Sequence, residues 1–434
     1  MSDETPFEGV AALPAASTIR AVGSTVQVID RRRPLPPTER RDRLTATEVD
    51  ALAAAITAAV EPLRRHSLRP ELGLSGGRDS RMVAAALHAA GIPFDASTRG
   101  FDDQPDAIVA RLVAAALGVQ KHRVWAPKRR GQGDRVEVEH PLERAHRAVW
   151  IGEGMNSALD DLNGSAGFRV APRLSGSGGE IIRGGYLYNQ QDLSPRAIRI
   201  RIERLFTSGS QLLRDEANER AQRALRQWTA TAGPDHAERL AALYLQYRVG
   251  RWLVGPCTST LLNWTYYHPL LDNRVVRLAA GLPALARWNE QAVHALITRL
   301  APRLRDLPLE GHRWRYEQAR PRSLFEIRAW RRRYLVSGDG RTAGFDWRLH
   351  HDRPFAEMLR EAVMDGPAEL FRLVDREQVD RLFQTVPVTS PPIVWRLLTL
   401  SVLLSGGWRR GEWTPLGTVE VPIPPSVNGA TASL

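Results

Sequence analysis

A segment rich in glycine and serine, Leu74-Ser75-Gly76-Gly77-Arg78-Asp79-Ser80, has the residue types of a phosphate-binding loop. It lies between a short apolar stretch and an amphipathic helical pattern. The glycines let backbone N–H groups turn inward, toward the point at which the helix N-terminus also aims. Asp79 would repel a bare phosphate, so we expect it to hold a magnesium ion that bridges phosphate oxygens, while Ser75 and Ser80 donate hydrogen bonds. The alternative interpretation is an ordinary glycine turn with a helix cap.

This loop is not a Walker loop, because no Gly-Lys-Ser/Thr follows it, and it lacks the three spaced glycines of the dinucleotide fingerprint. It resembles the Ser-Gly-Gly-x-Asp-Ser loop of the ATP pyrophosphatases. That superfamily includes asparagine synthetases, β-lactam synthetases, lasso-peptide cyclases and several tRNA-modifying enzymes.

A second segment narrows the resemblance to the asparagine synthetases. Leu174-Ser175-Gly176-Ser177-Gly178-Gly179-Glu180-Ile181-Ile182-Arg183-Gly184-Gly185-Tyr186 is similar to the family segment L-S-G-D-G-G-D-E-L-F-G-G-Y. The resemblance implies that Glu180 is a catalytic residue and a second magnesium ligand beside Asp79. It also implies an ATP and pyrophosphate site made of Leu74, Ser75, Gly76, Gly77, Asp79, Ser80, Thr98, Gly178 and Gly179. The alternative is a glycine-rich loop with a solvated glutamate. Further similar stretches extend the resemblance over about residues 45 to 410.

Three departures from the family bear on the reaction. Ile181 stands where asparagine synthetases have a glutamate, which argues against plain ammonia-dependent asparagine formation; β-lactam synthetase also has an apolar residue there. Ser177 replaces an aspartate, so any base acting from that position is lost. The family's lysine near the pyrophosphate has no lysine counterpart. We choose Arg313 as its catalytic replacement, because a guanidinium can pair bidentately with a leaving pyrophosphate. The other local candidates are Arg303, Arg305 and Arg315.

The residue pattern predicts a sheet that positions these loops. Strand patterns at 72–74, 94–98 and 122–126 alternate with helical patterns at 79–90 and 106–117, which is typical of a parallel α/β sheet. Gly91 and Gly118 follow the two helices, where a left-handed residue is favoured. A helix that begins at Thr45 precedes this unit, with Glu48 placed to complete a capping box. Later helical patterns are clearest at 237–249, 291–301, 355–363 and 394–404.

We therefore predict an α/β fold with a parallel, approximately five-stranded, Rossmann-like ATP-pyrophosphatase sheet and a large helical C-terminal half. Residues 46–416 are expected to form the synthetase-like domain, and residues 417–434, rich in Pro, Ser and Gly, a flexible tail. Residues 1–45 include a strand-like stretch at 24–29 and resemble the last strands of the glutaminase domain of many relatives. They are a remnant of that domain or a linker to a partner subunit. Ser2 stands in place of a nucleophilic cysteine, so we expect no glutamine hydrolysis in this chain.

The composition excludes several classes of protein. The chain has 434 residues, of which 43% are apolar and 25% charged, as in ordinary globular proteins. It has no run of about eighteen apolar residues and no signal-peptide pattern, so we expect a cytoplasmic protein without a membrane span. The single cysteine, Cys257, excludes an internal disulfide and a multi-thiolate metal site.

The net charge is +12, and of the 60 basic residues only Lys121 and Lys128 are lysines. The arginine excess reflects either the codon usage of a GC-rich genome or a surface that binds phosphates. Between His312 and Tyr334, arginines alternate with aromatic residues, a pattern that can bind nucleic acid. We favour an arginine-rich helix whose aromatic residues pack inward.

The expected function is that of an ATP-dependent ligase with ATP and Mg²⁺ as cofactors. It adenylates a carboxylate, releases pyrophosphate and transfers the acyl group to an amine to form an amide. The expected partners are a small-molecule or peptide carboxylate and an amine, together with a separate amidotransferase or substrate-carrier subunit, but no nucleic acid or membrane. One alternative is a tRNA-modifying ATP pyrophosphatase, which the positive charge favours. Another is a nucleotide-binding paralogue without catalysis, which Ser177, Ile181 and the missing lysine favour.

Overall fold

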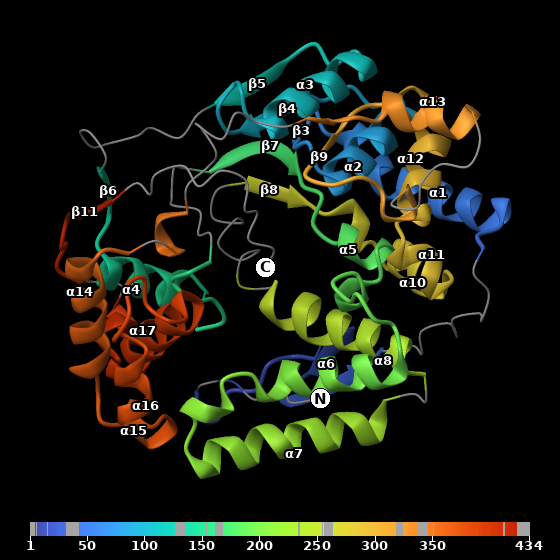
Figure 1. Cartoon of the computed structure of the whole chain (residues 1–434). Coiled ribbons are helices and arrows are strands. Elements are labelled where there is room, and N and C mark those ends of the chain that lie inside the picture. The colour runs from blue at the N-terminus through green and yellow to red at the C-terminus, as the bar shows by residue number, and fades with distance from the viewer. Residues whose placement is uncertain are drawn as a thin grey trace.

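The chain folds around a parallel sheet and several groups of helices. The computed structural model describes residues 5, 7–14, 16–31, 43–125, 135–152, 154–160, 168–232, 235–253, 255, 264–317, 324–336, 346–349, 351–410 and 413–422. Figure 1 shows the sheet with its covering helices at the upper right, a second group of helices at the left, and three helices along the bottom. Cys257 and Lys128 lie outside the described residues.

The main sheet has five strands in the order β5-β4-β3-β7-β8, and every neighbouring pair is parallel. Its strands are β3 (Glu71–Gly73), β4 (Asp95–Arg99), β5 (His122–Trp125), β7 (Arg169–Leu174) and β8 (Trp264–Tyr267). The predicted parallel α/β fold is thus confirmed. The chain runs from β3 outward to β5 and then returns to place β7 on the other side of β3, so the strand order reverses between β3 and β7. Ligands of open parallel sheets bind at such a switch point, outside the carboxyl ends of the strands.

Local sequence signals set the helices beside the sheet. Helix α1 (Ala46–Val60) begins after Thr45, whose side chain accepts a hydrogen bond from the Glu48 amide while the Glu48 carboxylate accepts one from the Thr45 amide. The predicted capping box is therefore confirmed. Helices α2 (Arg78–Ala89) and α3 (Pro105–Leu117) match the predicted helices within one residue at each end. Gly91 and Gly118 adopt φ values of +63° and +70°, the left-handed conformation expected of them.

Apolar faces of α1, α2, α10 (Asn273–Gly281) and α12 (Gln291–Leu300) meet in one hydrophobic core next to the sheet. This core contains Ile56, Met82, Leu174 and Leu296, each at most 1% exposed. Burial of such side chains is the main stabilising contribution to this part of the fold. It fixes α2 against the sheet, and the first turn of α2 carries Asp79.

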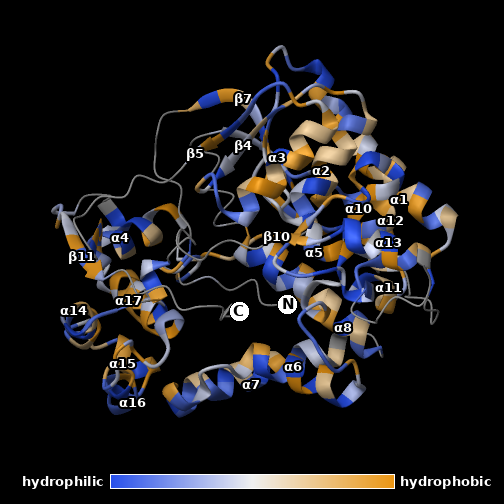
Figure 2. Ribbon diagram, turned by 45° about the horizontal axis from the view of Figure 1, so that its top comes forward, coloured by the Kyte–Doolittle hydropathy of each residue, from blue (hydrophilic) through white to orange (hydrophobic). Residues whose placement is uncertain are grey.

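A separate hydrophobic cluster joins α6 (Pro195–Thr207), α7 (Asp215–Thr231) and α8 (His236–Leu243). Figure 2 shows hydrophilic and hydrophobic residues alternating along α6 and α7, as amphipathic helices require. The helix predicted at 237–249 is present, but it changes to π-helical geometry over Tyr244–Trp252. Leu187, directly after the second glycine-rich segment, packs in this cluster.

The C-terminal helices form a third cluster with an earlier segment of the chain. It joins α4 (Pro141–Gly152), α14 (Arg353–Met364), α15 (Leu370–Leu373), α16 (Arg376–Arg381) and α17 (Pro391–Ser405). Strand β11 (Thr418–Pro422) pairs antiparallel with β6 (Arg135–Glu139), and Val421 is fully buried. The expectation of a flexible tail from residue 417 is therefore wrong over residues 418–422, because pairing with a distant strand satisfies their backbone groups.

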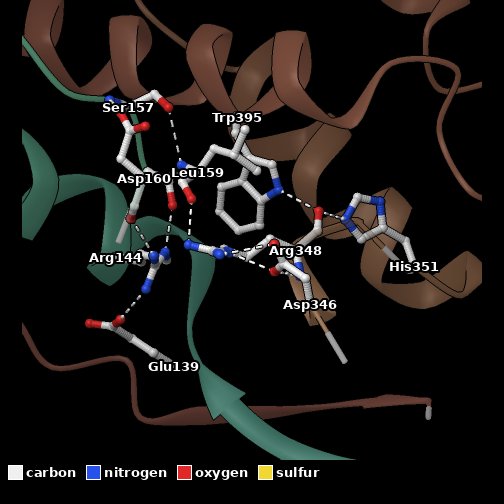
Figure 3. A network of polar contacts seen from close by, with 10 residues as sticks. Glu139, Arg144, Ser157, Leu159, Asp160, Asp346, Arg348, His351 and Trp395 are labelled. Atoms are coloured by element: carbon white, nitrogen blue, oxygen red, sulfur yellow. Dashed lines mark hydrogen bonds and ion pairs between the residues drawn. The ribbon is translucent and has the colours of Figure 1, made fainter. Parts of the chain in front are cut away.

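Two arginines donate hydrogen bonds to the backbone of the turn at residues 157–160, next to this third cluster, as Figure 3 shows. Arg144 donates to the backbone carbonyls of Ala158 and Asp160, and Arg348 donates to that of Leu159. The Arg348 carbonyl in turn accepts from the Trp395 indole at 2.8 Å. Because both arginines also pair with carboxylates, Glu139 and Asp346, and the network connects separate segments of the chain, we assign it to stability rather than to catalysis.

The remaining elements are short or peripheral. Strands β1 (Ser17–Val22) and β2 (Thr25–Asp30) form an antiparallel hairpin, which includes the strand predicted at 24–29. Strands β9 (Leu309–Glu310) and β10 (Leu335–Val336) form a parallel pair. The other short helices are α5 (Gly179–Ile182), α11 (Ala284–Trp288) and α13 (Leu324–Arg332). Among the described residues, no helix has both the length and the apolar character needed to cross a membrane.

Candidate active site

The two glycine-rich segments meet at the carboxyl ends of β3 and β7. They pack so closely that a Cβ atom at Gly176 would lie 2.6 Å from the Ser80 amide nitrogen, and one at Gly179 would overlap the Asp79 carboxyl group. Gly178 adopts φ +93°, which side-chain-bearing residues rarely adopt. The glycines of the second segment therefore allow its backbone to approach the first loop, and the structure brings Asp79 and Glu180 together as expected.

The first loop is held by its own serines. The Ser75 and Ser80 hydroxyl oxygens lie 3.0 Å apart, and the Gly77 amide donates to Ser75 Oγ at 3.1 Å. The Gly76 amide donates to Asp106 Oδ1 at 2.7 Å. The Gly76 N–H, which the sequence assigns to a phosphate, is therefore directed to a carboxyl oxygen of the protein itself. Asp106 comes from α3, and the sequence did not reveal this contact.

Asp79 lies where the two loops touch. Its Oδ2 accepts an ion-paired hydrogen bond from Arg183 Nη2 at 2.5 Å. Burial raises the pKa of Asp79 to about 6, Arg183 opposes the rise, and the charge of nearby Glu180 adds to it. Burial also raises the pKa of Tyr244, which contacts Glu180. Two carboxylates and one guanidinium therefore share a largely buried position.

Asp79 and Glu180 could supply two oxygen ligands to a magnesium ion. Asp79 Oδ1 is buried and has no hydrogen-bond partner among the described residues, so it retains the lone pairs that a hard cation needs. Glu180 stands beside it on α5. The described part of the chain has no cluster of three or more His, Cys, Asp or Glu side chains that could hold a metal. Oxygens from nucleotide phosphate and water would therefore have to complete the coordination.

A buried ion pair adjoins this position. Arg78 Nε lies 2.8 Å from Glu290 Oε1, and the two side chains are 5% and 0% exposed. Arg78 also donates to the His312 carbonyl at 2.6 Å and packs over the Trp314 ring. Arg78 is the variable position of the Ser-Gly-Gly-x-Asp-Ser loop, so the ion pair ties that loop to the residues before α12.

Tyr188 forms the accessible edge of the same cluster. Its hydroxyl donates to Glu290 Oε1 at 3.2 Å and lies 2.7 Å from His312 Nε2. The guanidinium groups of Arg183 and Arg315 stack on its ring at 4.6 Å and 4.5 Å from the centroid. Sequence reasoning gave no role to Arg183, Tyr188 or Glu290. Their nearness to one another in space is not visible in their spacing along the chain.

Ser177 lies in a hydrogen-bonded chain that ends on a histidine. Ser175 Oγ is 3.0 Å from Ser177 Oγ and 2.9 Å from His268 Nδ1. Burial lowers the pKa of His268, so its imidazole is neutral near pH 7. A histidine is therefore connected through Ser175 to the position where the sequence indicated that a base had been lost.

Two predicted site residues are engaged elsewhere. Arg313 donates to the backbone carbonyls of Trp330 and Arg333 and stacks on the Trp330 ring, so its guanidinium holds the end of α13 and not a phosphate. Its choice as the lysine replacement is corrected accordingly. Thr98 is 2% exposed, and its hydroxyl donates to the Leu74 carbonyl at 2.6 Å, which ties β4 to β3. Leu74 itself is buried in the core and contributes to the site through its backbone.

The described part of the arginine- and aromatic-rich stretch after His312 is divided between the interior and the surface: Arg328, Arg331 and Arg332 are exposed, and Tyr334 is 52% exposed. Trp314 is 2% exposed, and Arg333 pairs with Glu317 and Asp306. Phe325 is 88% exposed, but its immediate neighbours before α13 lie outside the described residues. The inward-packed interpretation therefore holds for Trp314 but not for Phe325 and Tyr334.

Comparison with protein families identifies one match. The model of the family described as asparagine synthase matches residues 51–318 of the 434, a range that contains both glycine-rich segments and the Glu290–His312 cluster. The search of curated proteins found no match to this chain.

Proposed function

Because this chain belongs to the asparagine synthase family, whose members are ATP-dependent ligases, we propose that it forms an amide bond by way of an acyl-adenylate. The observation that supports this proposal is the contact between the two glycine-rich loops at the switch point of the sheet, where Gly179 packs against Asp79 and Glu180 is near enough to raise its pKa. ATP is the cosubstrate, with its phosphates at the loop Ser75–Ser80. A magnesium ion on Asp79 and Glu180 would neutralise charge on those phosphates.

The reaction has two steps. The substrate carboxylate attacks the α-phosphorus of ATP, which forms an acyl-adenylate and releases pyrophosphate. The amine then attacks the activated carbonyl and releases AMP. In the first step the Ser75 and Ser80 hydroxyls and the N-terminus of α2 orient the leaving pyrophosphate, and in the second a base must take the proton of the amine.

We assign that base to His268, acting through the two serines. Ser175 Oγ donates to Ser177 Oγ at 3.0 Å in this structure and lies 2.9 Å from His268 Nδ1, so both hydroxyls must turn before a proton from an amine held at Ser177 can pass by way of Ser175 to the imidazole. His268→Ala should therefore slow amide formation about 100-fold, while adenylation, followed as ATP–pyrophosphate exchange, stays near the wild-type rate.

The matched control for this prediction is His66→Ala, which removes a histidine that contacts Tyr267 of β8 but not the serines. In the wild type, amide formation should persist below pH 6.5 and fall as the pH drops through the lowered pKa of His268, because the protonated ring cannot accept a proton. An equal loss in both reactions would assign His268 to structure instead.

The amine donor is proposed from the positions of the second glycine-rich segment at which this chain differs from asparagine synthetases. Ile181 is 4% exposed and packs in the core where asparagine synthetases carry a glutamate. We therefore propose a larger or intramolecular amine, or ammonia delivered by a separate amidotransferase subunit. A small-molecule or peptide carboxylate is the proposed acyl donor.

The proposal is tested by measuring AMP and pyrophosphate in separate reactions that contain Mg-ATP with amino acids, with peptides or with tRNA. AMP formed with amino acids or peptides supports the ligase. AMP formed only with tRNA, with an affinity that falls steeply with salt, would support a tRNA-modifying enzyme. A folded protein that binds ATP and forms no AMP in any reaction would support the non-catalytic paralogue. The Asp106–Gly76 and Arg183–Asp79 contacts are the features that favour that reading.

A further inference from the structure

Arg183 has an unusual position for a residue next to a proposed metal site. It follows α5 directly, so the same short turn supplies Glu180 and the guanidinium that pairs with Asp79. The Arg183 and Asp79 side chains are 14% and 21% exposed, which shields their attraction from solvent screening. A positive charge is thus built in beside the two carboxylates that the proposed function assigns to magnesium.

The ion pair leaves one buried polar atom unused on each partner. Asp79 Oδ1 has no hydrogen-bond partner among the described residues, and neither does Arg183 Nε, although both atoms are buried. A buried donor and a buried acceptor without partners are costly to leave unmet. A cation would satisfy the carboxylate oxygen, and a phosphate oxygen would satisfy the guanidinium. A phosphate that carries a bound metal ion would therefore supply a partner for both atoms, the metal for Asp79 Oδ1 and a phosphate oxygen for Arg183 Nε.

The charges of the three side chains support the same inference. With Arg183 in place, Asp79 and Glu180 together present a net charge of only −1 to a divalent cation. The phosphates of ATP bring their own negative charge, which Arg183 can pair with in exchange for Asp79. The Tyr188 ring, which stacks on the Arg183 guanidinium at 4.6 Å, offers a surface along which the side chain can turn.

We propose that Arg183 exchanges partners during the reaction. Without nucleotide it neutralises Asp79 and keeps divalent cations weakly bound; when ATP binds, its guanidinium moves to a phosphate oxygen and leaves Asp79 to the metal. Arg183 thereby supplies, from the second loop, the charge on the leaving pyrophosphate that was expected from Arg313. This inference rests on the proposed function, because it assumes that ATP phosphates reach the Ser75–Ser80 loop.

The test is a pair of binding measurements that need no turnover. Mn²⁺ is titrated into the nucleotide-free protein at pH 8 and followed by electron paramagnetic resonance, and inorganic pyrophosphate is titrated by calorimetry in the presence of Mn²⁺. Arg183→Gln should bind Mn²⁺ at least about tenfold more tightly than the wild type and pyrophosphate about tenfold more weakly, because one positive charge is removed near both ligands. Unchanged affinities for both ligands would overturn the proposal.

Two further variants separate this exchange from a general loss of charge. Arg315→Gln removes the second guanidinium that stacks on Tyr188. No contact between Arg315 and Asp79 is found among the described residues, so this variant should leave Mn²⁺ affinity within about twofold of the wild type. Arg183→Lys keeps the positive charge and should keep Mn²⁺ binding as weak as in the wild type. If Arg183→Gln does not fold, the Mn²⁺ titration is made with Arg183→Lys instead. Equal tightening of Mn²⁺ binding by Arg315→Gln would contradict the specific role of Arg183. Because both readouts are equilibrium affinities, they stand apart from the question of whether the wild type forms AMP.

Discussion

Replacing Gly179 with alanine is expected to abolish most adenylation while the protein remains folded. The added methyl group would occupy the space of the Asp79 carboxyl group, so the second loop must move away from the first. A displacement of about 1 Å between groups that act on the same phosphates is enough to cost about 100-fold in rate. The expected cost in stability is only about 1–3 kcal/mol, as for other overpacked positions.

Pyrophosphate release and thermal unfolding are measured on the same preparation of the Gly179→Ala protein. Gly73→Ala is the matched control, since it lies in β3 next to the first loop and the nearest atom to its added Cβ is 3.6 Å away, an ordinary contact. A Gly179→Ala protein with near-wild-type adenylation would show that the close approach of the two loops is not required for the reaction.

Glu290→Gln should cause the largest loss of stability among single changes near the site. Glu290 is fully buried, pairs with buried Arg78, and accepts hydrogen bonds from the Tyr188 hydroxyl and the Arg315 amide. Removing its charge leaves the Arg78 guanidinium buried without its counter-ion, which typically costs about 3–5 kcal/mol. Urea unfolding monitored by circular dichroism gives the free energy of unfolding.

The control for Glu290 is an exposed ion pair of similar type. Glu61→Gln removes the partner of Arg64, whose side chains are 45% and 50% exposed, and should change stability by less than about 1 kcal/mol. The double variant Arg78→Met with Glu290→Gln should recover part of the loss, because no buried charge is then left unpaired. A Glu290→Gln protein as stable as the wild type would contradict this account of the cluster.

The sequence predicted the first loop well because its structure is local. A strand, two glycines and a helix with Asp79 in its first turn follow one another directly, and capping and glycine signals fix their boundaries within about two residues. The sheet was predictable for the same reason. The expectation that Asp79 and Glu180 lie near each other came from a family resemblance of the two glycine-rich segments. Because β3 and β7 are neighbours in the sheet, the segments that follow these strands lie side by side.

The residues that sequence reasoning missed depend on contacts between distant segments. Glu290 meets Arg78 and Tyr188 across more than a hundred residues, and no spacing rule connects them. The Arg313 guanidinium turns to α13, while the neighbouring His312 carbonyl and Trp314 ring face Arg78, and the sequence carries no information on these side-chain directions. Residues 418–422 were expected to be loose from composition, which carries no information on a partner strand.

The central claim, carboxylate adenylation at the two loops, is tested most directly by ATP–pyrophosphate exchange. Labelled pyrophosphate, Mg-ATP and fractionated pools of amino acids and peptides are incubated with the wild-type protein and with Asp79→Asn. The account predicts that label enters ATP only when a carboxylate substrate is present, and that Asp79→Asn reduces the exchange at least about 1000-fold. Carboxylate-dependent formation of ADP and phosphate, without label in ATP, would contradict it.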